Sequence, residues 1–139
     1  MPEVRQERTH WRDEELSLRH RDWGWDCPMV DIDFLALEYD KGHATAIVEY
    51  KNEHAKLANP KHPSYKALAE LGNKAGIPVI GCRYKSDFTN WRAVPLNRVA
   101  LAVLPKPREL SEAEWVRFLY GIRGREMPDE IKNICSRKE

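Results

Sequence analysis

The sequence predicts an α/β fold in which helices flank a mixed central β-sheet, and three observations support this class. Segments with strand-like composition alternate with segments that have helical periodicity. Two consecutive strand-like segments are separated by a four-residue turn, which predicts a β-hairpin. A strand–helix–strand passage across residues 44–84 then requires a parallel crossover. The length of 139 residues suits a single domain.

The composition narrows the class of protein further. Hydrophobic residues make up 42% of the chain and charged residues 32%, which is typical of a globular domain rather than a disordered segment. No apolar run approaches the roughly 20 residues that span a bilayer, and the charged first residues do not resemble a secretory signal. The three cysteines are widely spaced and suit neither a disulfide framework nor a zinc site. We therefore expect a cytoplasmic protein without a membrane partner.

The first half of the chain contains a helix followed by the hairpin. Residues 7–22 have apolar side chains at helical spacing, which predicts a helix. Residues 29–39 are rich in β-branched and aromatic side chains, which favours a strand. Residues 40–43 include a glycine and predict a turn. A second strand at residues 44–51 completes the hairpin.

A helix and a buried strand are expected next. Ser64 is a suitable N-cap for a helix over residues 65–74. Gly76 is positioned to end that helix, and a proline follows it after one further residue. The short apolar run at residues 77–84 then predicts a strand that is buried in the sheet.

The last third of the chain is expected to contain one more strand and a helix. Residues 91–104 predict at least one strand, and the half that begins at Arg98 is the stronger. Ser111 and Glu114 have the spacing of a capping box, which predicts the start of a helix. Residues 121–139 are expected to form a weakly packed tail with one short helix.

The charges are nearly balanced overall but unevenly distributed. Residues 1–40 hold five basic and eleven acidic side chains, a net charge of −6. Residues 41–98 hold ten basic and four acidic side chains, a net charge of +6. A protein that binds phosphates by bulk charge alone is usually more basic overall. The pattern suits carboxylates gathered around a metal with lysines nearby. Ordinary surface charge that segregates by chance is the alternative, and charge alone favours that alternative.

Acidic side chains and a lysine are expected on one face of the hairpin. Glu49 and Lys51 are two positions apart on a strand, so their side chains point the same way. Asp31 and Asp33 likewise share a face of the preceding strand, which lies about 4.8 Å away in a hairpin. Parity does not separate these two aspartates. Carboxylates together on a sheet face are costly unless a cation neutralises them, and Mg²⁺ binds one or two carboxylates. The sequence therefore predicts a site for Mg²⁺ or Mn²⁺.

The hairpin carries a recognisable motif. Asp33-Phe34-Leu35-Ala36-Leu37, a turn and Ile47-Val48-Glu49-Tyr50-Lys51 resemble the active-site hairpin of the PD-(D/E)xK nuclease superfamily. The resemblance implies a restriction-endonuclease-like core in helix-strand-strand-strand-helix-strand order. It covers about residues 11–104 and leaves residues 105–139 as a C-terminal helical extension of one domain. Small single-domain members, such as archaeal Holliday-junction resolvases and phage-encoded nucleases, are the most similar kind.

The resemblance assigns roles to individual residues. It implies Asp33, Glu49 and Lys51 as catalytic residues, with Lys51 positioning the attacking water. The implied metal ligands are Asp33, Glu49 and the backbone carbonyl oxygen of Tyr50, with Asp31 and Glu15 as further candidates. Glu14 is nearly as good as Glu15 on helical geometry. The chain departs from the family pattern in two places, because Ile32 replaces a frequent proline and the second helix lacks a frequent glutamine.

Basic and polar side chains near the motif are candidates for substrate binding. The candidates are Arg19, His20, Arg21, His54, Tyr65, Lys66 and Lys85. As a group, Lys56, Lys61, Lys66 and Lys85 would suit a rim that contacts phosphates. The structural alternative is that each is an ordinary surface residue. For Arg19, His20 and Arg21 this alternative is a basic helix end, which the helix dipole favours.

These residues predict a metal-dependent DNA nuclease that cleaves phosphodiester bonds by metal-activated water attack. DNA is the expected partner, and the resemblance to small nucleases also suggests a homodimer. The expected location is the cytoplasm of a bacterium or of a phage-infected cell. One alternative is a catalytically inactive nuclease fold that binds DNA or serves in assembly. Another alternative is a protein-interaction domain in which the motif arose by chance.

Overall fold

A computed structural model covers the chain and describes residues 14–23, 26–56, 59 and 61–136. The chain divides into two compact units, Met1–Asp31 and Ile32–Glu139, and each is described by itself. In the described residues, no helix is long and apolar enough to cross a membrane.

The first unit contains helix α1, Glu14–Asp22. Acidic side chains occupy its first turn and basic side chains its last turn, which is the distribution that the helix dipole favours. The described part of the predicted helix over residues 7–22 is therefore helical, and residues 7–13 lie outside the described residues.

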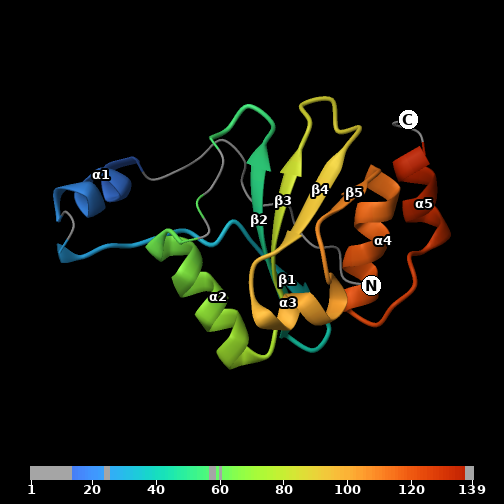
Figure 1. Cartoon of the computed structure of the whole chain (residues 1–139), viewed down its shortest axis with the longest axis horizontal. Helices are drawn as coiled ribbons and strands as arrows, with labels where there is room; N and C mark the ends of the chain where they lie inside the picture. Colours follow the sequence, from blue (N-terminus) through green and yellow to red (C-terminus); the bar gives the residue numbers. More distant parts are fainter. Residues whose placement is uncertain (1–13, 24–25, 57–58, 60, 137–139) are drawn as a thin grey trace. The chain divides into compact units, whose positions relative to one another are not determined.

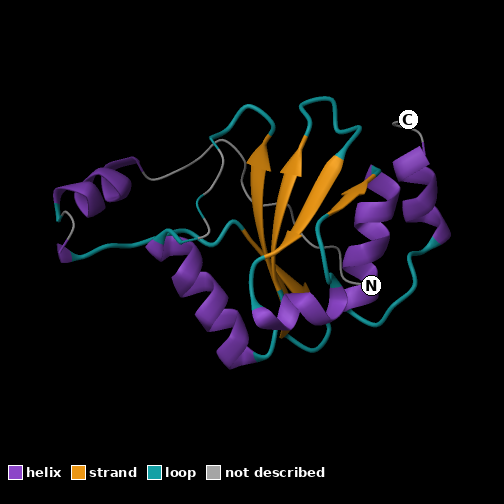
Figure 2. Ribbon diagram, in the orientation of Figure 1, coloured by secondary structure: helices purple, strands orange, loops and turns teal. Residues whose placement is uncertain are grey.

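The second unit is built on a five-stranded mixed sheet with the order β1-β2-β3-β4-β5 (Figures 1 and 2). The strands are β1 (Phe34–Glu38), β2 (His43–Asn52), β3 (Val79–Tyr84), β4 (Trp91–Pro95) and β5 (Arg108–Leu110). Strands β2 and β3 are parallel, and every other neighbouring pair is antiparallel. The predicted α/β class, the hairpin and the parallel crossover are confirmed. The described elements do not follow the helix-strand-strand-strand-helix-strand order, because two strands and not three lie between α1 and the next helix, Pro63–Ala75.

Helix α2 (Pro63–Ala75) makes the crossover between β2 and β3. Its N-cap is His62, whose Nδ1 accepts a hydrogen bond from the Ser64 N–H at 3.2 Å. The prediction that Ser64 caps this helix is therefore wrong, because Pro63 already occupies the first helical turn. Gly76 ends the helix with φ 73°, as predicted.

Three more helices follow in the second unit. They are α3 (Arg98–Val103), α4 (Glu112–Ile122) and α5 (Asp129–Ser136). The capping box predicted at the start of α4 is present, because Ser111 and Glu114 exchange both hydrogen bonds. The tail is not weakly packed, because Met127 is 5% exposed and Cys135 is 4% exposed.

Two strand predictions need correction. The first strand begins at Phe34 and not at residue 29, so Asp31 and Asp33 precede it. The segment from Arg98 is helix α3 and not a strand. A short apolar run is compatible with either a strand or a helix. Here the Asn97 side chain caps a helix, because its oxygen accepts a hydrogen bond from the Ala100 N–H at 2.9 Å.

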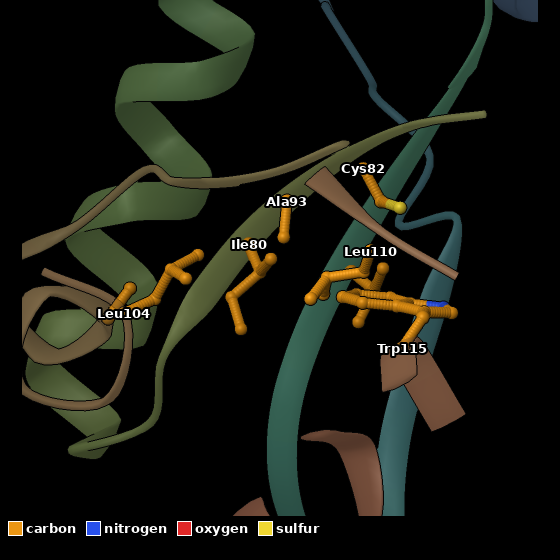
Figure 3. Close-up of a cluster of buried hydrophobic side chains, with 8 residues drawn as sticks. Ile80, Cys82, Ala93, Leu104, Leu110 and Trp115 are labelled. Carbon is orange, nitrogen blue, oxygen red and sulfur yellow. The ribbon is translucent and has the colours of Figure 1, made fainter. Parts of the chain in front are cut away.

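The hydrophobic core has a part on each face of the sheet. On one face Ile47 and Val79 pack against Leu68 of α2. On the other face Ile80, Cys82 and Ala93 pack with side chains from α3 and α4, as Figure 3 shows. The largest fully buried side chain there is Trp115. The alternation along β2 therefore divides its residues between two cores.

An ion-pair network attaches the end of β1 to the segment after α4. Glu38 is 8% exposed and accepts hydrogen bonds from Arg123 Nε at 3.0 Å and Nη2 at 3.3 Å. Arg125 Nη2 lies 2.6 Å from Glu38 Oε1. The hydrogen bond from Arg123 lowers the pKa of Glu38 below its ordinary value. The network holds the edge strand against the rest of the unit.

Replacing Gly72 by alanine is expected to destabilise the second unit by roughly 1–3 kcal/mol, the usual cost of overpacking. A Cβ at this position would meet Val79 Cγ2, and would lie 2.7 Å from Asn97 Nδ2 and 2.9 Å from the Ile77 oxygen. The Asn97 side chain cannot move away freely, because its oxygen accepts a hydrogen bond from the Val79 N–H at 2.9 Å. Urea unfolding would measure the loss.

Gly121→Ala is the matched control for this substitution. It also lies in a helix, and a Cβ there would meet no atom within 4 Å. We expect no loss of stability from it, because alanine is the better helix former. Equal stability of Gly72→Ala and the wild type would contradict the prediction.

Candidate functional site

Two hydrogen bonds join Asp33, the residue before β1, to the second half of β2. The Asp33 N–H donates to Glu49 Oε1 at 3.2 Å. The Tyr50 N–H donates to Asp33 Oδ2 at 3.1 Å. The pairing of Phe34 with Val48 brings the two segments alongside each other. The structure therefore places the carboxylates of Asp33 and Glu49 next to each other.

Glu49 is an unusual residue for the interior of a sheet. Its side chain is 8% exposed, and burial raises its pKa above the ordinary value. The hydrogen bond from the Asp33 N–H lowers that pKa, the negative charge of Asp33 raises it, and the charge of Lys51 lowers it. A buried carboxylate beside a second carboxylate is destabilising without a partner of positive charge. The pair therefore has the electrostatic character of a cation site.

A cleft of about 200 Å³ opens over the face that carries Glu49. Its basic and acidic lining residues are Glu49, Lys51, Lys56, Arg83 and Arg92. Lys51 pairs with Arg83 on β3, and Arg83 pairs with Arg92 on β4. The three basic residues consequently form a row across three strands. Gly81 is opposite Glu49 in the register and adds no side chain to the cleft.

Two arginines of the cleft also stabilise its walls. Arg83 Nη2 donates to the backbone oxygen of Glu53 at 2.5 Å and to that of Ala55 at 3.3 Å. These bonds fix the loop that leads from β2 to Lys56. Arg92 Nη1 donates to Glu109 Oε1 at 2.7 Å, which ties β4 to β5.

The donor atoms at the carboxylate pair fit a hard divalent cation. In the described part of the chain, no group of three or more His, Cys, Asp or Glu side chains is placed to hold a metal ion, so the candidate site has two carboxylates. Asp33 and Glu49 supply carboxylate oxygens. The Tyr50 carbonyl points to the same side of its strand as the Tyr50 N–H, which bonds Asp33. Mg²⁺ binds through one or two carboxylates and keeps several waters, so this set suits Mg²⁺ or Mn²⁺.

The other predicted substrate-binding residues are dispersed. Tyr65 lines the cleft. Lys66 is exposed on α2, and His54 is exposed beside Glu53 at 3.8 Å, but neither lines the cleft. Lys85 lies in the turn after β3, away from the cleft lining. The structure therefore brings Tyr65 to the cleft and leaves these other three outside it.

Several predicted residues belong to the first unit. They are Glu14, Glu15, Arg19, His20, Arg21 and Asp31. Within that unit the ring of His20 packs edge-on against Trp23, with 4.6 Å between ring centroids. The residues that line the cleft all belong to the second unit.

Two charged residues of the cleft were not predicted from the sequence, Arg83 and Arg92. The alternation of side chains along β3 could have indicated Arg83, because Arg83 points to the same face of the sheet as Val79 and Gly81. Its pairing with Lys51 depends on the parallel register, which the sequence does not show. Lys56 was expected only as one member of a basic rim, and it lines the cleft itself.

No family model, curated protein or solved structure matches the chain. The resemblance to the PD-(D/E)xK superfamily consequently rests on the motif residues alone.

Proposed function

We propose that this chain is a metal-dependent nuclease that hydrolyses phosphodiester bonds in DNA, on a restriction-endonuclease-like core. One observation carries the proposal. Asp33 and Glu49 form a carboxylate pair that two hydrogen bonds hold together, and Glu49 lines a cleft whose other charged side chains are all basic. Carboxylates bind the cation and the basic row binds the phosphates of the substrate. Neither feature alone distinguishes a nuclease from a surface patch.

The residues have distinct roles in this proposal. Asp33, Glu49 and the Tyr50 carbonyl would hold Mg²⁺ or Mn²⁺, which supplies charge neutralisation and an acidified water. Lys51 shares the face of Glu49 and orients the attacking water or takes its proton. Lys51 also offsets the negative charge that develops on the phosphate. Water adds to phosphorus and the bond to the 3′ oxygen breaks, which leaves a 5′-phosphate and a 3′-hydroxyl.

The two arginines of the basic row have a different role from Lys51. Arg83 and Arg92 lie progressively further from Glu49 along the register. They are placed to contact phosphates that flank the one being cut. Such contacts fix the position of the substrate but carry no sequence information.

Lys51→Ala is expected to lower the cleavage rate by about 10²-fold, the lower end for loss of an acid–base group. Purified protein would be incubated with linear, circular, single-stranded and branched DNA, with Mg²⁺, with Mn²⁺ or with EDTA. Lys106→Ala is the matched control, because Lys106 is exposed in the segment before β5. We expect metal-dependent products from the wild type and from this control.

Equal behaviour of the wild type and Lys51→Ala on every substrate would contradict the nuclease. Binding of DNA without cleavage by both proteins would favour the inactive nuclease fold. Absence of both DNA binding and DNA cleavage would favour the protein-interaction domain.

A further inference from the structure

A second hollow lies on the sheet face opposite the cleft. It has a volume of about 440 Å³, which is within the usual range for ligand pockets. Five aromatic side chains line it, namely Phe34, Tyr50, Tyr84, Phe88 and Trp91. None of its lining residues is charged. We call this hollow the aromatic pocket.

The rings of the aromatic pocket are stacked rather than randomly packed. Tyr84 and Phe88 are nearly parallel, with an interplanar angle of 8° and 5.7 Å between centroids. Phe88 and Trp91 stack at 28° and 5.8 Å. Phe88 is 50% exposed and Phe34 is 61% exposed. The pocket therefore leaves about half or more of the Phe34 and Phe88 side chains exposed to solvent, where a flat aromatic ligand can pack against them.

The backbone holds Phe88 in an unfavourable conformation. Its φ is 60°, and it is the only described residue other than glycine with a positive φ. Bulky side chains rarely adopt this region, and such strain is often found at functional sites. The Phe88 N–H donates to the Lys85 oxygen at 2.8 Å, and the Trp91 Nε1–H donates to the Phe88 oxygen at 3.1 Å. The turn is thus built to keep this ring in the stack.

The aromatic pocket and the cleft share the same strand ends. Tyr50 lies between Glu49 and Lys51, so its ring faces the pocket while theirs face the cleft. The loops that follow β2 and β3 emerge at the same end of the sheet (Figure 1). They are joined there, because the Ser86 N–H donates to Glu53 Oε2 at 2.6 Å and Asn52 Nδ2 donates to Ser86 Oγ at 3.2 Å.

We propose that the aromatic pocket stacks unpaired nucleobases of the nucleic acid whose backbone lies in the cleft. This inference rests on the proposed function and names its substrate class, a nucleic acid with a single-stranded segment. A basic groove combined with exposed aromatic faces is the usual means of binding single strands. The uncharged lining accepts base faces and not phosphates, whereas bases inside a duplex are already stacked and cannot enter.

Phe88→Ala is expected to weaken binding of a labelled single-stranded oligonucleotide roughly tenfold, because one base loses its stacking partner. Binding of the blunt duplex of the same sequence should not change. Fluorescence anisotropy in EDTA would measure both affinities without cleavage. Phe88→Tyr, which keeps an aromatic face, should bind like the wild type. Phe88→Gly removes the ring and relieves the strained backbone. Circular dichroism of each variant would show that weaker binding does not come from a folding defect.

Leu101→Ala is the matched control, because Leu101 is 51% exposed on α3 and is not part of the pocket. Unchanged single-strand binding by Phe88→Ala and Phe88→Gly would overturn the inference. A change in oligomeric state by light scattering, with unchanged binding, would also overturn it and identify a protein interface. Phe88-dependent binding together with equal cleavage by the wild type and Lys51→Ala would retain the pocket and reject the nuclease.

Discussion

Glu49→Gln is expected to lower the cleavage rate by roughly 10²–10³-fold and, at the same time, to stabilise the metal-free protein. In the proposed nuclease the rate falls because glutamine removes a charge that would bind the cation at the reacting phosphate. Stability rises because Glu49 is 8% exposed, and burial and the neighbouring Asp33 both raise its pKa. Glutamine has the same shape, and its amide oxygen can still accept the Asp33 N–H. A gain on the order of 1 kcal/mol is typical when strain at an active site is relieved.

Two measurements on the same samples test whether Glu49→Gln both slows cleavage and stabilises the metal-free protein. Cleavage would be followed with Mg²⁺, and thermal unfolding would be followed in EDTA. Glu126→Gln is the control, because Glu126 is exposed after α4; it should change neither the rate nor the midpoint. Undiminished cleavage by Glu49→Gln, or a lower midpoint in EDTA, would contradict the assigned role of Glu49.

The strand that carries Glu49 could be predicted well from the sequence, whereas the position of Asp33 could not. Strand β2 spans His43–Asn52, close to the expected residues 44–51, because a long run of β-branched and apolar side chains has few alternatives. Asp33 precedes β1, so strand parity does not apply to it. Hydrogen bonds with Glu49 and Tyr50 fix it instead, and such tertiary contacts leave no local pattern.

The basic row and helix α3 show the same limit of local patterns. Lys51, Arg83 and Arg92 become neighbours only through the registers of β2 with β3 and of β3 with β4. Helix α3 begins at its N-cap residue, Asn97. The Asn97 side chain also accepts a hydrogen bond from the Val79 N–H and donates one to the Ile77 oxygen at 3.0 Å. These bonds connect positions about twenty residues apart in the sequence. The strand registers and the long-range hydrogen bonds therefore determine the basic row and helix α3, and neither leaves a pattern in the local sequence.

Trp115→Ala is expected to destabilise the second unit by roughly 3–5 kcal/mol, the range for loss of a buried large aromatic side chain. Trp115 is 2% exposed and packs with Ile80 and Leu110 in the core. Its Nε1–H donates to the Tyr50 hydroxyl at 3.0 Å. Burial raises the pKa of that hydroxyl to about 12, so it stays protonated in the physiological range. Urea unfolding followed by circular dichroism would measure the loss.

The same substitution links core packing to the cleft, because Tyr50 lies between Glu49 and Lys51 on β2. Trp115→Phe keeps most of the buried ring and removes the hydrogen bond, so we expect it to cost less than the alanine variant. If Trp115 supports the cleft through Tyr50, Trp115→Phe should also slow cleavage under conditions where the variant is fully folded. A loss below about 1 kcal/mol for Trp115→Ala would contradict its place in the core. A fully folded Trp115→Phe with the wild-type rate would restrict its role to stability.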